Sequence, residues 1–147
     1  MSPQCYASLD EVEALIARFE AGELPLREWT HATHLTVGVW YLLHLPEHEA
    51  AARTIDGIRA HNRVHGIRLG AHRGYHETIT LFWLAVTRSF LDRVTKHDAP
   101  LELVNAFVAE LSHRSSLIFD FYSRARLQSW KARHYWIEPD LQSLASI

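Results

Sequence analysis

Apolar residues recur at helical spacing over most of the chain, and no segment alternates apolar and polar residues for long enough to predict a strand. The pattern predicts five main helices, over residues 8–24, 31–44, 47–66, 76–97 and 99–113. Shorter helical pieces are expected over residues 115–123 and 127–136, followed by an extended tail over 137–147. We therefore expect an all-α protein that forms a single helical bundle.

Local signals for helix ends agree with this pattern. Ser8 and Glu11 have the spacing of a capping box, and Gly22 suits the end of the first helix. Thr30 is a good N-cap for the second helix, and Pro46 is typical of the start of a third. Each of the first three predicted helices thus begins at a residue that favours a helix start.

The composition is that of an ordinary globular protein. The chain has 147 residues, of which 48% are hydrophobic and 22% charged, so we expect one domain over residues 1–147. The five tryptophans are most simply core residues: Trp29, Trp40, Trp83, Trp130 and Trp136.

Charge and cysteine content exclude several classes of function. The net charge of −2 supplies no general attraction to nucleic acid or to a membrane surface. The single cysteine, Cys5, cannot form an intramolecular disulfide or a cysteine-based zinc site. No signal peptide or long apolar run is evident, so we expect a cytoplasmic protein.

Histidines at two predicted helix starts are the main candidates for chemistry. His31 and His34 lie three residues apart and share a helix face, and His76 begins the fourth predicted helix. Three imidazoles from two helices match the ligand count of a catalytic metal site with an open position. The sequence therefore predicts one divalent metal ion, such as zinc, iron or manganese, held by these three residues.

The residues around His76 extend this hypothesis. Glu77 is a candidate catalytic base or a fourth ligand, and Thr78 and Thr80 would support the ligands through hydrogen bonds. Trp83 lies on the same helix face as His76, further along the predicted helix, and would form an apolar wall of the pocket. Two alternatives stay open. The histidines bond to neighbouring carboxylates or carbonyls, or they perform acid–base chemistry with Glu77 without a metal.

A basic segment precedes these residues. No acidic residue occurs between Arg59 and His76, whereas four arginines and three glycines do. Backbone N–H groups and arginine forks are typical of an anion site, so Arg68 and Arg73 are candidate anion ligands. His72 and Tyr75 are further candidates to face the substrate, and the absence of a Walker motif argues against a nucleotide cofactor. Pairing of these arginines with acids on neighbouring helices is the alternative.

The motifs W-T-H-x-x-H-L, G-Y-H-E-T-x-T and E-P-D-L resemble those of a family of short bacterial helical proteins with no established activity. The resemblance spans about Trp29 to Leu141, and it implies that the functional residues lie at the matching positions. These are Trp29, Thr30, His31, His34, Tyr75, His76, Glu77, Thr78, Thr80, Glu138, Pro139 and Asp140.

Two helical metalloenzyme classes are weaker matches. His34, His76–Glu77 and Asp120 resemble, in order, the ligands of HD-domain phosphohydrolases, although the dyad here is His-Glu instead of His-Asp. DinB-like bundles use three histidines from separate helices, which His31 or His34 with His76 resembles. Their usual second pair would fall on His72 and His76, within a glycine-rich loop.

Three hypotheses for function follow. The first is a metal-dependent enzyme acting on a small anionic substrate, a hydrolase by default because hydrolysis needs only a metal-activated water. The second is a bundle that binds or senses a small ligand, or a metal, without turnover. The third is a structural module that forms a homodimer through an apolar helix face.

Overall fold

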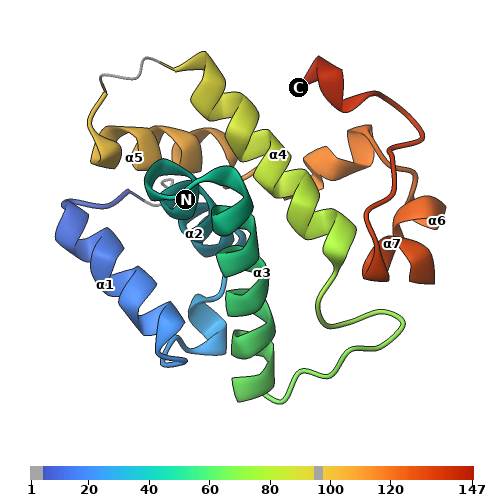
Figure 1. Cartoon of the computed structure of the whole chain (residues 1–147), viewed down its shortest axis with the longest axis horizontal. Coiled ribbons are helices and arrows are strands. Elements are labelled where there is room, and N and C mark those ends of the chain that lie inside the picture. The colour runs from blue at the N-terminus through green and yellow to red at the C-terminus, as the bar shows by residue number, and fades with distance from the viewer. Residues whose placement is uncertain (1–4, 95–97) are drawn as a thin grey trace.

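The computed structural model describes residues 5–94 and 98–147, and every regular element in these ranges is a helix (Figure 1). This confirms the predicted all-α class. Five helices have twelve or more residues: α1 (Leu9–Glu20), α2 (His31–His44), α3 (Glu47–Val64), α4 (Glu77–Arg93) and α5 (Pro100–Leu111). The shorter ones are η1 (Leu26–Glu28), η2 (Ser115–Asp120), α6 (Arg124–Leu127), α7 (Trp130–His134) and η3 (Leu144–Ser146).

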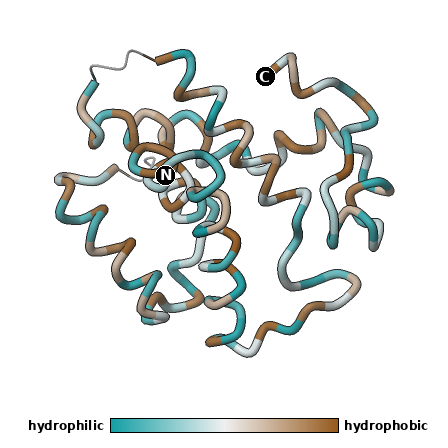
Figure 2. The backbone as a smooth tube through the Cα atoms, viewed as in Figure 1, coloured by the Kyte–Doolittle hydropathy of each residue, from teal (hydrophilic) through white to brown (hydrophobic). Residues whose placement is uncertain are grey.

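Helix α2 lies at the centre of the molecule and packs against α3, α4 and α5 (Figure 1). Helix α1 packs against α3, and the C-terminal α7 packs against α4. Brown and teal positions alternate along α1 and α3 in Figure 2, as expected of helices with one buried face. None of the helices in the described ranges is both long and apolar enough to cross a membrane.

Most predicted helix ends are confirmed. The Ser8 hydroxyl accepts from the Glu11 amide at 3.4 Å, and the Thr30 hydroxyl accepts from the amide of Thr33 at 3.3 Å. Gly22 has a φ of 74°, the left-handed conformation that favours glycine after a helix.

Three details of the C-terminal half differ from the prediction. The helical piece expected over residues 127–136 is instead divided between α6, which begins at Arg124, and α7. The fourth helix was expected over residues 76–97, but α4 ends at Arg93, and residues 95–97 lie outside the described ranges. The tail over residues 137–147 was expected to be extended, and it contains the short helix η3.

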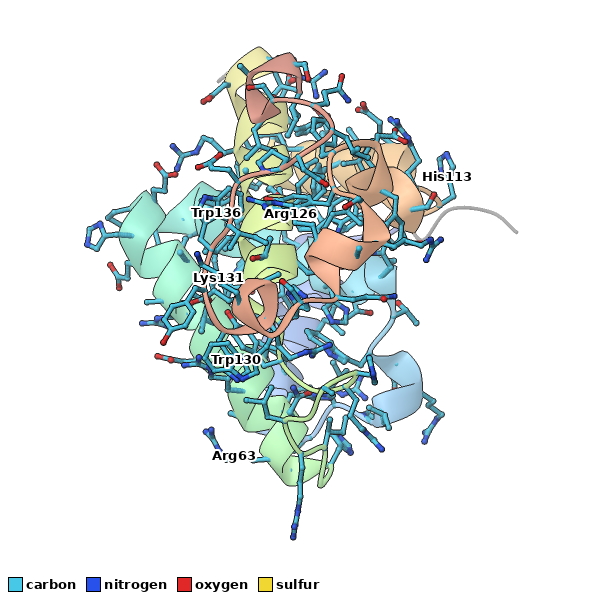
Figure 3. All side chains as sticks on the ribbon, turned by 90° about the vertical axis from the view of Figure 1, so that its right-hand side faces the viewer. Arg63, His113, Arg126, Trp130, Lys131 and Trp136 are labelled. Carbon is cyan, nitrogen blue, oxygen red and sulfur yellow. The ribbon has the colours of Figure 1, made fainter. Side chains whose placement is uncertain are left out.

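The prediction that all five tryptophans are core residues is wrong for Trp130, which is 66% exposed. Trp130 begins α7, a helix of five residues whose buried residue is Ala132. So short a helix has one narrow buried face, and the small Ala132 occupies it. Figure 3 shows Trp130 and Lys131 on this outer side of the molecule.

A close approach between α1 and α3 depends on a glycine. A Cβ atom added at Gly57 would lie 2.5 Å from the Phe19 ring, which is itself buried. At Gly38, in α2, an added Cβ would lie 3.6 Å from Leu84, an ordinary contact distance. The two glycines are thus a matched pair within helices, one enclosed and one with room.

Gly57→Ala is therefore expected to lower the free energy of unfolding by about 1–3 kcal/mol, because overpacking outweighs the gain in helix propensity. Gly38→Ala is expected to raise it by up to about 1 kcal/mol, since only the propensity changes. Urea unfolding of both variants followed by circular dichroism measures this difference. Equal stabilisation by the two substitutions would show that the close approach of Phe19 to α3 is not rigid.

Candidate functional site

A cavity of about 600 Å³ lies between α2, α3 and α4, and we call it the central pocket. Its apolar walls include Trp29, Leu35, Ile58, Ile79, Trp83 and Leu84. The polar side chains that line it include His31, His34, Asn62, Arg73, His76 and Thr80. The three histidines predicted from the sequence to converge therefore do line one pocket. No Asp or Glu is among its described lining residues.

An aromatic stack holds one side of the pocket. Trp29 stacks on Phe19 with ring centroids 5.0 Å apart, and it also contacts the rings of His34, at 3.7 Å, and His61, at 4.8 Å. Trp29 was predicted to be a core residue at the start of the second helix, and here it also forms pocket wall. On α4, Trp83 meets the ring of His31 edge-on at 4.6 Å.

His34 is held as a neutral hydrogen-bond acceptor. Its Nδ1 donates to the carbonyl of Thr30 at 2.7 Å, which places the ring proton on Nδ1 and leaves the lone pair on Nε2. Burial lowers the pKa of His34 to about 4, and the carbonyl of Thr30 opposes this only in part. At neutral pH the ring therefore presents an unprotonated nitrogen.

His31 carries a polar atom without a partner. Its Nε2 is buried and has no hydrogen bond to any described residue, although the side chain lines the pocket. Burial lowers the pKa of His31, against an opposing hydrogen bond with the backbone of Leu111. A buried polar atom without a partner costs free energy, and a ligand in the pocket would recover it only if the His31 ring turned to expose this nitrogen.

His76 has a different role, as the N-cap of α4. Its Nδ1 accepts from the amide of Ile79 at 3.2 Å, and its Nε2 donates to the carbonyl of Leu127 at 2.8 Å. Burial lowers the pKa of His76, so the ring is neutral and both its nitrogens are engaged. This corresponds to the alternative in which a histidine bonds to a neighbouring carbonyl.

Glu77 is not among the lining residues of the central pocket. Its Oε1 accepts from the Tyr75 hydroxyl at 2.5 Å. Burial, followed by this hydrogen bond, raises the pKa of Tyr75 above its ordinary range. The carboxylate of Glu77 is thus already hydrogen-bonded within the chain, to Tyr75.

The two threonines proposed as supports of the ligands point in different directions. Thr78 is fully buried and donates to the carbonyl of Ala132 at 2.7 Å, which ties α4 to α7. Thr80 lines the central pocket and donates to the carbonyl of His76 at 2.9 Å. Only Thr80 is therefore brought to the pocket.

The loop between α3 and α4 carries the predicted anion ligands. Gly74 has a φ of 91°, and an added Cβ would lie 2.9 Å from Leu69, so the loop turns tightly before α4. Arg73 is exposed and lines the central pocket. Arg68 and His72 are exposed and are not among the lining residues. Of the loop candidates Arg68, His72, Arg73 and Tyr75, the structure brings Arg73 and Tyr75 to the central pocket.

The donor set does not assemble into a metal centre as it stands. The described residues contain no group of three or more His, Cys, Asp or Glu side chains that could hold a metal ion. Metal binding by His76 would require the loss of its bond to Ile79 or to Leu127. Asp120, the distant aspartate of the HD-domain comparison, is exposed. The predicted metal site thus stays a prediction that needs a rearrangement.

Sequence reasoning missed the contribution of α3 to this pocket. Thr54, Ile58 and Asn62 all line it, and they follow one another at intervals of four residues. That spacing places them on one helix face, and the polar Asn62 at its end was a usable signal.

Comparison with protein-family models, curated proteins and solved structures finds no significant match to the chain.

Proposed function

We propose that the protein binds a small, largely apolar organic molecule with an acidic or hydroxyl group in the central pocket. The observation that carries this proposal is the pairing of apolar walls with the unprotonated Nε2 of His34. A volume of about 600 Å³ lies within the usual range for ligand pockets.

The chemistry of the pocket defines the ligand class. The unprotonated nitrogen of His34 accepts hydrogen bonds, so it favours a ligand O–H or N–H. Arg73 at the edge would favour a carboxylate, while no described lining side chain contributes negative charge. Trp29 and Trp83 supply flat apolar surfaces suited to a ring.

This proposal corresponds to the second hypothesis from the sequence. The first, a metal-dependent hydrolase, stays a prediction, and its metal would depend on His31 and His34 together with a displaced His76. Metal analysis of protein purified without a histidine tag tests it: about one equivalent of metal is expected if it is right.

We expect 2-naphthol, an apolar ring with one hydroxyl group that stays protonated at neutral pH, to bind in the central pocket with millimolar or tighter affinity. His34→Phe keeps the ring on Trp29 but removes the acceptor nitrogen, and Ile58→Trp narrows the pocket. Each should weaken binding about 5-fold or more. Titrations followed in ¹H–¹⁵N NMR spectra measure both the affinity and the residues affected.

Trp130→Ala is the control, because it removes an exposed aromatic surface outside the pocket. Its affinity should equal that of the wild type. Loss of binding in this variant, or chemical-shift changes confined to α7, would overturn the proposal.

A further inference from the structure

A smaller cavity of about 230 Å³ adjoins the central pocket, and we call it the basic pocket. The two cavities share Asn62, Ile67 and Tyr75 in their walls. The basic pocket is otherwise formed by the end of α3, the following loop and α7. It is thus a separate space that the site described above does not use.

The lining of the basic pocket is positively charged. Arg59 and Arg63 come from α3, and Arg133 comes from α7. No Asp or Glu is among its described lining residues. The ion pairs within the described ranges involve Arg18, Arg53 and Arg88, so none neutralises these three guanidinium groups.

Two of the three arginines are held in place by other contacts. Arg133 donates through one terminal nitrogen, Nη1, to the carbonyls of Gly74 (3.0 Å) and Tyr75 (3.3 Å). Its other N–H groups make no hydrogen bond to a described residue. The guanidinium of Arg59 lies 4.6 Å from the centre of the Tyr75 ring. These side chains are therefore ordered before any ligand arrives.

Burial adds a cost that a counter-ion would remove. Arg133 is half-buried, and burial lowers the pKa of its guanidinium. Glu77, two residues after Tyr75, is bonded to the Tyr75 hydroxyl and is not a partner in the ion pairs of the described ranges. Arg59 and Arg63 are exposed to solvent, so this cost falls on Arg133, and an anion bound beside it would reduce the cost.

We propose that the basic pocket binds a phosphate-type oxyanion through Arg59, Arg63 and Arg133. Arginine forks match the oxygens of such an anion, and here they approach from two helices that lie far apart in sequence. The side chain of Arg63 extends from the C-terminal part of α3 on the outer side that also carries Trp130 and Lys131 (Figure 3). The anion would thus enter from solvent. This inference does not rest on the function proposed for the central pocket.

Inorganic phosphate titrated at constant ionic strength tests the proposal. The arginine Nε–H signals and the backbone amides of residues 59–75 report binding in ¹H–¹⁵N spectra. Saturable shifts are expected, and Arg59→Gln and Arg63→Gln should each weaken binding about 10-fold. Arg133→Gln is avoided, because Arg133 also supports the backbone at Gly74.

Arg68→Gln is the matched control. Arg68 carries the same charge on the adjoining loop, but it does not line the basic pocket. Its affinity for phosphate should change less than about 2-fold, as expected for a screened surface charge. Acetate should bind at least about 10-fold more weakly than phosphate. Absence of saturation, equal weakening by Arg68→Gln, or equal affinity for acetate would each overturn the proposal.

Discussion

Replacement of His76 by alanine is expected to lower the free energy of unfolding by about 3 kcal/mol. The substitution removes the N-cap of α4, which accepts from the Ile79 amide, and it leaves the buried carbonyl of Leu127 without a donor. A lost cap costs about 1 kcal/mol, and an unsatisfied buried carbonyl about 1–3 kcal/mol. Urea unfolding followed by circular dichroism measures the loss.

Two further variants separate the contributions. Asparagine is a good N-cap, so His76→Asn should recover about 1 kcal/mol while the Leu127 carbonyl stays unpaired. His72→Ala changes the other histidine of the same segment at an exposed loop position. It should alter stability by less than about 0.5 kcal/mol.

The same experiment distinguishes a structural role of His76 from metal binding. With a structural role, addition of EDTA leaves the stability of the wild type unchanged. If EDTA instead destabilises the wild type but not His76→Ala, the metal site predicted from the sequence is supported. A stability of His76→Ala within about 0.5 kcal/mol of the wild type would contradict the capping role.

Local sequence signals predicted much of the fold, because helix formation and capping depend on residues close in the chain. Ser8, Thr30 and Gly22 act within four residues of their partners, and their roles were readable. The convergence of His31, His34 and His76 on one pocket was also readable. It required only the faces of two amphipathic helices.

The orientation of the imidazole rings could not be predicted from the sequence, since it depends on a segment that is distant along the chain. His76 donates to Leu127, which lies 51 residues further on, and Thr78 donates to Ala132, which lies 54 residues further on. The sequence around His76 does not predict that α6 and α7 pack next to it. For the same reason the basic segment suggested Arg68 and Arg73 as an anion clamp. The basic pocket instead joins Arg63 to Arg133.

The protein is expected to lose stability steeply between about pH 7 and pH 5, because several histidines are buried in the neutral form. Burial lowers the pKa of His31, His34, His61 and His76, in the case of His34 to about 4. The ordinary value in the unfolded chain is about 6.5. Below that pH the unfolded chain takes up protons that the folded chain does not.

The sign of the effect follows from these values. The stabilisation is complete above about pH 6.5 and is lost as the pH falls from there towards the lowered pKa. For His34 alone the loss by pH 5 is about 2 kcal/mol, from about 1.5 pH units at 1.36 kcal/mol each. The other three histidines add to it, while most carboxylates stay ionised at that pH.

Urea unfolding at about pH 7.5 and pH 5 measures this loss directly. His34→Gln removes the titrating ring, so its loss between the two pH values should be smaller than that of the wild type by about 1–2 kcal/mol. His48→Gln alters an exposed histidine of α3 and should retain the full loss. If His34→Gln also retains it, His34 takes up its proton in the folded protein as readily as in the unfolded chain, and burial in the central pocket does not hold its ring neutral at pH 5.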